Sequence, residues 1–322
     1  MQTLTRTTNT VTAIPGLLGY IPAESVAIAY VRDGVYLLAA NVTAEQMNRP
    51  GVDHLVRLAL TQDAQSVYVV AVAGDRAGAV IQFAEKVAEK MAAAGVEVAA
   101  IAHTFAITEG ARWTDRRTGN TGEIGDLYSH PAALERLSSY GFPIAPSREA
   151  IETWFAPVEP VAELPTAEQL TIGDREPGAK VLRELAETIT GYARPSDELA
   201  ARTIAFLSAG SDTRDVLLGL GKAGTGAGRV LVEIANRARG IARVQLLTVA
   251  AVLLYTGGNP PAANIAIDQA HDETAASGEE TPVLLSLMTT AVAVALPPNR
   301  LQRLINTGAE AASTDYGIEF DA

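Results

Sequence analysis

The sequence predicts an α/β domain followed by an all-helical domain. In the first half, short β-rich runs flank an amphipathic helix, an order typical of a mixed sheet with one parallel pair of strands. In the second half, apolar helical segments are separated by Gly and Pro. Four prolines fall between the two halves. We therefore predict an α/β domain over residues 1–155, a Pro-rich linker over 156–177 and a helical domain over 178–322.

The α/β domain is expected to open with a β-hairpin. The runs Val26–Val31 and Val35–Val42 flank Asp33-Gly34, a dipeptide that suits a tight primed turn. A helix is expected near Val52–Leu60. The nearly continuous apolar run Ser66–Ala73 is typical of a strand that is covered on both faces.

A βαβ unit is expected next. Apolar residues recur every four positions through Ala77–Ala94, which indicates an amphipathic helix, and a strand is expected over Val96–Thr108. Residues 110–128 are polar and contain Gly, and we expect them to form a loop. Two short helices are predicted near Pro131–Tyr140 and Ser147–Phe155.

The helical domain is expected to consist of paired helices with short breaks. The predicted helices are Ala179–Tyr192, Asp197–Ser208, Arg214–Leu220, Gly228–Arg239, Ala242–Tyr255, Ala262–Thr274, Pro282–Leu296 and Asn299–Ala312. Their pairing resembles tetratricopeptide packing, although the repeat period is irregular. The apolar runs Val244–Tyr255 and Val283–Leu296 are shorter than the roughly 20 residues that span a bilayer, so both are expected to be buried helices.

Composition narrows the possible functions. The 322-residue chain has no cysteine, which excludes disulfides, thiolate nucleophiles and Cys-based metal sites. Its net charge of −12 is spread over both halves and disfavours nucleic acid as the main partner. Residues 1–13 are Thr-rich and lack the apolar stretch of a signal peptide. We expect a cytoplasmic protein that makes no use of a membrane.

Several segments, in chain order, are similar to a known family. They are LLGYIPAESVAIAYV at 17–31, Arg112-Trp113, Ser147-Arg148-Glu149, Arg214-Asp215 and GGNPPAANIA at 257–266. Together they resemble the DUF4192 family of actinobacteria and their phages. Ala111 and Thr114 depart from the family pattern, which puts the following loop in doubt. The resemblance implies the fold and an actinobacterial or phage setting, hence the host cytoplasm for a phage protein, and it implies no particular activity.

Two familiar motifs fail on their context. Residues 219–224 match G-x-G-x-x-G, but the segment before them is predicted to be helical, whereas a dinucleotide site needs a strand there. A glycine-rich helix connection is therefore expected. The four histidines, His54, His103, His130 and His271, do not have metal-ligand spacing. We expect no metal and no cofactor.

One loop has the composition of a ligand site. It follows a strand of the α/β domain, where ligands tend to bind, and its arginines and Trp suit a phosphate or a base. The candidate ligand residues are Arg112, Trp113, Asp115, Arg116 and Arg117, joined by Glu24 and Asp75 from other strand ends. The alternative is a solvated loop with Trp113 anchored in the core.

A second cluster of arginines lies in the helical domain. Arg237, Arg239 and Arg243 concentrate positive charge on adjoining helices and form a candidate partner-docking patch, with a solvated face as the alternative. The leading hypothesis is a non-catalytic protein-binding or scaffold module with a protein partner. The alternatives are an enzyme or sensor for a phosphorylated, nucleotide-like small molecule and a protein that binds single-stranded nucleic acid. The oligomeric state is left open.

Overall fold

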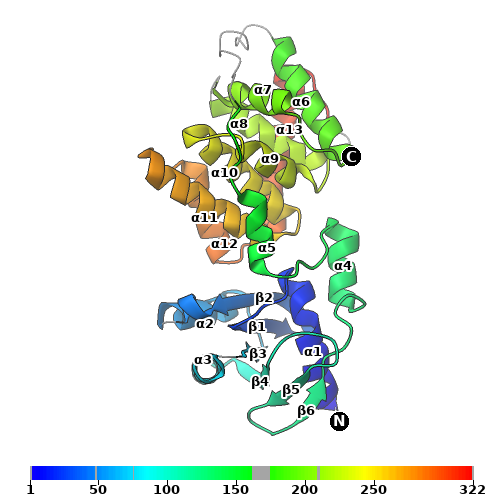
Figure 1. Cartoon of the computed structure of the whole chain (residues 1–322), viewed down its shortest axis with the longest axis vertical. Coiled ribbons are helices and arrows are strands. Elements are labelled where there is room, and N and C mark those ends of the chain that lie inside the picture. Colours follow the sequence, from blue (N-terminus) through cyan, green and yellow to red (C-terminus); the bar gives the residue numbers. More distant parts are fainter. Residues whose placement is uncertain (1, 48, 75, 162–174, 209–210, 321–322) are drawn as a thin grey trace. The chain divides into compact units, whose positions relative to one another are not determined.

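The chain folds into two compact units, residues 1–150 and 151–322, shown in Figure 1. The computed structural model describes residues 2–47, 49–74, 76–161, 175–208 and 211–320. Most of the predicted linker, residues 162–174, lies outside these. Residues 156–161 belong to the second unit, where the Val158 amide donates to the Asn236 carbonyl over 3.0 Å.

The first unit contains a six-stranded mixed sheet in the order β2-β1-β3-β4-β5-β6. The strands are β1 (Ser25–Arg32), β2 (Val35–Thr43), β3 (Ser66–Val72), β4 (Glu97–Thr104), β5 (Arg112–Asp115) and β6 (Thr121–Glu123). β1 and β2 form the predicted hairpin. β3 and β4 are parallel and are joined by helix α3, so the βαβ prediction is also confirmed.

The loop prediction for residues 110–128 was wrong in part, because β5 and β6 form a hairpin there and extend the sheet beyond β4. In the segment RWTDRRTGNTGE, five residues are of types that are depleted in strands, namely Asp115, Gly119, Asn120, Gly122 and Glu123. The strands form because β5 pairs with β4 and because the Trp113 side chain is buried.

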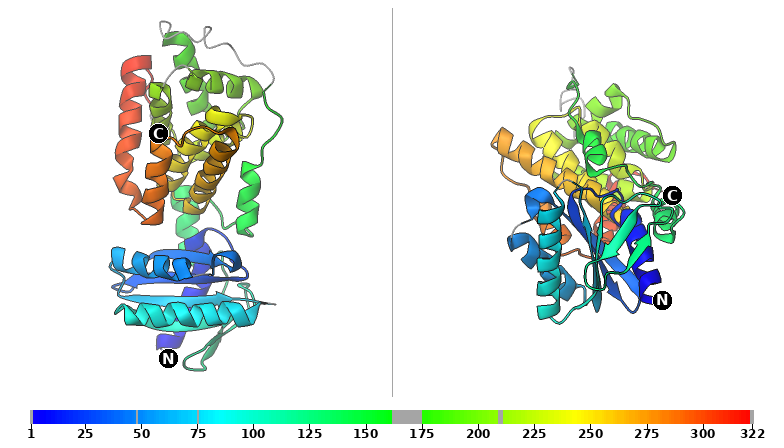
Figure 2. Two further views of the ribbon diagram at one scale, coloured as in Figure 1. Left: turned by 90° about the vertical axis from the view of Figure 1, so that its left-hand side faces the viewer. Right: turned by 60° about the horizontal axis from the view of Figure 1, so that its bottom comes forward.

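Helices cover both faces of this sheet. The first unit has α1 (Gln2–Leu18), η1 (Ala44–Gln46), α2 (Arg49–Thr61), α3 (Ala77–Ala93) and α4 (Pro131–Tyr140), and α5 (Arg148–Glu152) begins in it. Figure 2 shows α2 and α3 on one face of the sheet and α1 on the other. The sheet therefore has two apolar faces, which agrees with the continuous apolar sequence of β3.

Helix α1 is the main element that the sequence did not predict. Its Thr-rich segment is poor in strong helix formers, and β-branched residues lose rotamer freedom in a helix. In the fold, Thr10 and Thr12 are buried, and each hydroxyl donates to a carbonyl one turn earlier over 2.9 Å. Packing against the sheet stabilises a helix that its composition disfavours.

The second unit is helical. Its elements are η2 (Thr153–Phe155), α6 (Arg175–Thr190), α7 (Asp197–Ser208), α8 (Ser211–Leu218), η4 (Gly219–Lys222), α9 (Ala227–Ala235), α10 (Gly240–Thr256), α11 (Pro260–Ser277), α12 (Val283–Ala293), η5 (Pro298–Arg300) and α13 (Gln302–Tyr316). Helix α10 is buried on nearly all sides from Arg243 to Tyr255 and contacts α7, α8, α9, α11 and α12. The prediction of a buried helix over Val244–Tyr255 is confirmed.

The last helix returns to the first ones, so tetratricopeptide-like stacking is not confirmed. Helix α13 packs against α6, α8 and η4. The approach is close at two glycines, since a Cβ on Gly308 would lie 2.5 Å from the Asp215 carbonyl and one on Gly219 would lie 2.7 Å from the Ala309 amide. Residues 219–222 of the G-x-G-x-x-G match form η4 between α8 and α9, and Gly219 in addition allows the close crossing with α13, which was not predicted.

Candidate functional site

Glu24 meets the turn that follows β3 at the carboxyl end of the parallel strands. Its carboxylate accepts the amides of Gly74 (2.8 Å) and Arg76 (3.3 Å), which lead into α3. Glu24 holds a positive φ of 42°, so the backbone is strained where the side chain reaches this turn. Asp75 lies outside the described residues.

This arrangement bears on anionic ligands. The amides at the start of a helix after a strand are the groups that bind phosphate in many nucleotide sites. Here a carboxylate of the chain itself takes the amides of Gly74 and Arg76. An anionic ligand at the turn would therefore have to displace Glu24.

Phe105 also lies at this edge and was not among the predicted site residues. Its side chain is 73% exposed, and the ring lies 3.0 Å from the position that a Cβ on Gly74 would take. His103 Nε2 lies 3.4 Å from the Ala73 carbonyl oxygen. The strand end could have been inferred from the βαβ pattern, whereas the exposure of Phe105 depends on the packing around it.

The register of β5 separates the three arginines of the predicted ligand loop. Thr104 at the carboxyl end of β4 pairs with Trp113, so Arg112 lies near the edge that carries Glu24. β5 runs antiparallel to β4, and its far end is followed by the other two arginines. Arg116 approaches Glu85 of α3 at 3.4 Å, and Arg117 donates to the Ala99 carbonyl over 2.9 Å.

Trp113 and Asp115 of that loop point into the unit. Trp113 is 1% exposed, and its indole N–H donates to the Thr8 hydroxyl of α1 over 3.2 Å. Asp115 is 3% exposed, and its carboxylate accepts from the Arg117 amide (3.0 Å) and the Thr118 hydroxyl (2.8 Å). Both side chains hold the hairpin in place, which matches the alternative in which Trp113 anchors the loop.

His130 connects α4 to α1 in the same unit. Its Nδ1 accepts the Ala132 amide over 3.1 Å and so caps α4, which leaves the proton on Nε2, 3.1 Å from the Asn9 side-chain oxygen. Burial lowers the pKa of His130 below its ordinary 6.5. The hydrogen bonds of His130 in the fold therefore require its neutral imidazole.

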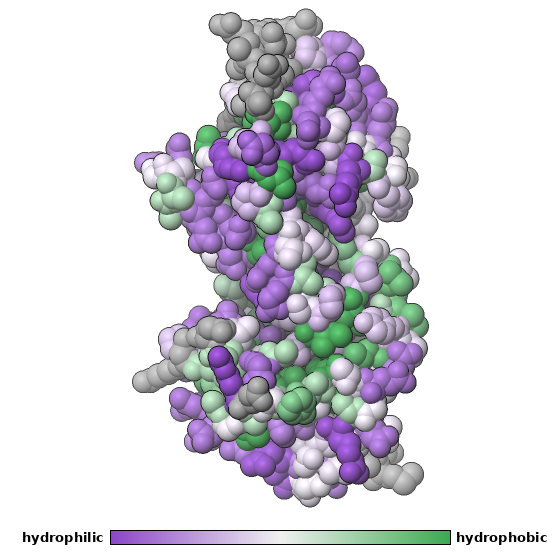
Figure 3. Space-filling view, in the orientation of Figure 1, coloured by the Kyte–Doolittle hydropathy of each residue, from purple (hydrophilic) through white to green (hydrophobic). Residues whose placement is uncertain are grey.

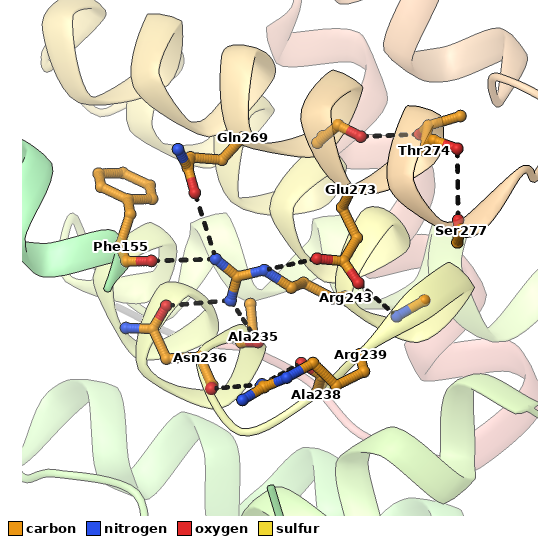
Figure 4. Close-up of polar contacts among 12 residues, drawn as sticks. Phe155, Ala235, Asn236, Ala238, Arg239, Arg243, Gln269, Glu273, Thr274 and Ser277 are labelled. Carbon is orange, nitrogen blue, oxygen red and sulfur yellow. Dashed lines mark hydrogen bonds and ion pairs between the residues drawn. The ribbon is translucent and has the colours of Figure 1, made fainter. Parts of the chain in front are cut away.

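In the second unit, Arg243 of the predicted docking patch is buried at 1% exposure. Figure 4 shows its guanidinium surrounded by acceptors. It donates to the carbonyls of Ala235 (2.8 Å) and Phe155 (2.9 Å), and its Nε lies 3.4 Å from a Glu273 carboxylate oxygen. Glu273 in turn accepts the Gly240 amide over 2.6 Å. Burial lowers the pKa of Arg243, and the Glu273 carboxylate opposes this effect.

The neighbouring arginines also bind the chain itself. Arg239 donates to the Val158 carbonyl over 2.6 Å, and Arg237 forms a 2.8 Å ion pair with Asp197. Arg229 stacks on Trp154 with 4.9 Å from its guanidinium carbon to the ring centroid. Arg229, Arg239 and Arg243 thus hold residues 154–158 against the helices, and all four arginines form their contacts within the unit.

Helix α12 presents a different kind of surface, which the sequence reasoning missed. The apolar run Val283–Leu296 was predicted to be buried, but only one side of the helix packs against α10 and α11. The α12 outer face comprises Val283, Ser286, Leu287, Thr290, Ala293 and Val294, all exposed. Val283 is 74% exposed and Leu287 61%. These positions follow helical spacing and form one stripe.

A smaller apolar surface lies on α4 of the first unit. Figure 3 shows hydrophobic side chains gathered over α4. Leu134 and Leu137 are each 51% exposed. Exposed Glu135 and Ser138 interrupt this surface, so it is less continuous than the α12 outer face.

Fold and surfaces together define a two-unit protein with a mixed α/β unit and a closed helical unit. Within the described ranges, no three His, Asp or Glu side chains gather as they would to hold a metal ion. No helix there has the length and apolarity that crossing a membrane requires.

The chain belongs to the family described as domain of unknown function DUF4192, whose model matches residues 8–299. No curated protein and no solved structure matches the chain.

Proposed function

We propose that the chain is a non-catalytic protein-binding module of the cytoplasm whose helical unit docks a protein partner through the α12 outer face. The observation that carries the proposal is the exposure of Val283 and Leu287 in a stripe without charge. Large apolar side chains that form a contiguous exposed surface commonly mark interaction sites, whereas singly scattered ones do not. The absence of cysteine fits a reducing compartment.

The predicted polar site residues support the proposal indirectly, because their side chains are already paired within the chain. Arg243 and Arg239 are engaged by the helical unit, and Glu24 is engaged by the turn after β3. Side chains held in this way stabilise the two units. Among the described residues, we therefore assign the partner to the α12 outer face, which is more continuous than the apolar surface on α4.

Site-specific photo-crosslinking tests the proposal. A photoreactive phenylalanine analogue replaces Leu287 in the full chain expressed in cells, and a matched variant carries it at Ala275, an exposed residue of α11. The expected result is protein adducts at position 287 that are missing or much weaker at 275. Equal adducts at both positions, or none at 287, would overturn the proposal.

A further inference from the structure

The chain segments on either side of α12 carry opposite charges. Glu279 and Glu280 precede the helix, and Arg300 and Arg303 follow it, with no charged residue between Glu280 and Arg300. All four side chains are exposed. Within the part of the chain that the structure describes, none of them takes part in an ion pair. In chain order, the apolar stripe is thus preceded by an acidic pair and followed by a basic pair.

We propose that the partner of the α12 outer face is a second copy of the chain, paired antiparallel about a twofold axis. This inference rests on the proposed function and names the partner. A twofold interface uses the same surface on both copies, so that surface must be complementary to itself. Acidic residues before α12 and basic residues after it meet this condition only when the two helices run in opposite directions. A parallel pair would place Glu280 against Glu280.

The composition of the stripe suits such a pair. Its large side chains, Val283, Leu287 and Val294, are separated by Ser286, Thr290 and Ala293. Small residues between large ones let two helices approach to an axial distance of about 8–10 Å and interdigitate. The net charge of −12 on each copy opposes association, so the local pairing of Glu280 with Arg300 supplies the charge complementarity that the whole surface lacks.

Sedimentation equilibrium of the purified full chain tests the inference, over a range from about 1 μM to about 1 mM that spans weak to moderate affinities. The expected result is a reversible monomer–dimer equilibrium. Leu287→Glu should weaken it at least about tenfold, because it buries a charge in the apolar stripe. Leu134→Glu on α4 is the matched control, since it makes the same change at another exposed leucine, and it should leave the equilibrium unchanged.

Charge reversal tests the antiparallel arrangement. Glu280→Arg and Arg300→Glu should each weaken dimerisation about fivefold or more, because each places like charges together twice in the dimer. The double variant should restore it to within about twofold of the original. A double variant as weak as the sum of the single ones would overturn the twofold pairing.

An introduced cysteine gives an independent test of the antiparallel pairing, because the chain has no cysteine of its own. Thr290→Cys, near the middle of the stripe, should form a disulfide-linked dimer on mild oxidation, whereas Ala275→Cys should not. A chain that stays monomeric throughout, or a dimer insensitive to Leu287→Glu, overturns the inference. If position 287 then still crosslinks to a different protein in cells, only the self-pairing fails. If it crosslinks to nothing, the proposed function fails with it.

Discussion

The substitution Arg243→Met is expected to lower the free energy of unfolding of the helical unit by about 3 kcal/mol. Removing one partner of a buried ion pair costs about 3–5 kcal/mol, because the other charge stays buried without compensation. The Glu273 side chain is 20% exposed, so water solvates the remaining carboxylate in part. The lower end of the range of about 3–5 kcal/mol therefore applies. The carbonyls of Phe155 and Ala235 also lose the guanidinium as a donor, although the Ala235 carbonyl still accepts the Ala238 amide.

Fluorine NMR can assign the loss to one unit. The chain has two tryptophans, Trp113 in the first unit and Trp154 in the second. Labelling with 5-fluorotryptophan therefore gives one resonance for each unit during urea unfolding. With a slope of about 2 kcal/mol per M, a loss of about 3 kcal/mol lowers the Trp154 midpoint by about 1.5 M. The Trp113 midpoint should stay in place.

Two further variants sharpen this test. Arg239→Met removes a neighbouring arginine that is exposed, and it should lower the Trp154 midpoint by less than about 0.5 M. Adding Glu273→Gln to Arg243→Met should recover about 1 kcal/mol, because it neutralises the carboxylate left behind. A Trp154 midpoint that falls no further for Arg243→Met than for Arg239→Met would refute the reasoning.

Three other predictions concern the sheet unit and use the Trp113 resonance or the melting temperature. Gly122→Ala should destabilise the unit by about 1–3 kcal/mol, since the new methyl would lie 2.7 Å from the Trp113 ring, whereas Gly78→Ala, in open space within α3, should stabilise it by about 0.5–1 kcal/mol. Changes in stability of the same sign for Gly122→Ala and Gly78→Ala would contradict this prediction. Because the pKa of His130 is lowered from 6.5, its contribution is complete above pH 6.5 and is lost as the pH falls through the folded-state pKa. His130→Asn, which keeps a helix-capping oxygen, should flatten that slope, and an unchanged slope would exclude His130 as its source. Glu24→Gly should be about 1 kcal/mol more stable than Glu24→Ala, since a φ of 42° strains alanine, and equal melting temperatures would argue against strain.

Elements with strong periodicity were predictable from the sequence. The four-residue repeat of apolar side chains in α3 and the Asp33-Gly34 turn between β1 and β2 are local patterns, and the structure agrees with both. Helix α1 and the β5–β6 hairpin were missed for the opposite reason. Their residues have weak local preference, and contacts with distant parts of the unit, such as Trp113 with Thr8, decide their conformation.

The candidate sites were less predictable, because the composition of a segment does not determine the direction in which each side chain points. Arg112 and Arg116 are near neighbours in sequence, yet they lie at opposite ends of the extended strand β5. Arg243 and Arg239 share a helical spacing, but one is buried and the other exposed. For α12 the sequence showed an uncharged, mainly apolar helix, and only its packing against α10 and α11 shows that one side remains uncovered.

The return of α13 to α6 and α8 sets an order for folding during synthesis. The first unit ends at residue 150, so that unit can form while the helices are still being translated. The helical unit cannot close the Gly219–Gly308 crossing until α13 has left the ribosome. Until then, the faces of α6 and α8 that α13 covers stay open to the solvent. A nascent chain stalled before residue 302 should therefore hold a folded sheet unit and an incomplete helical one.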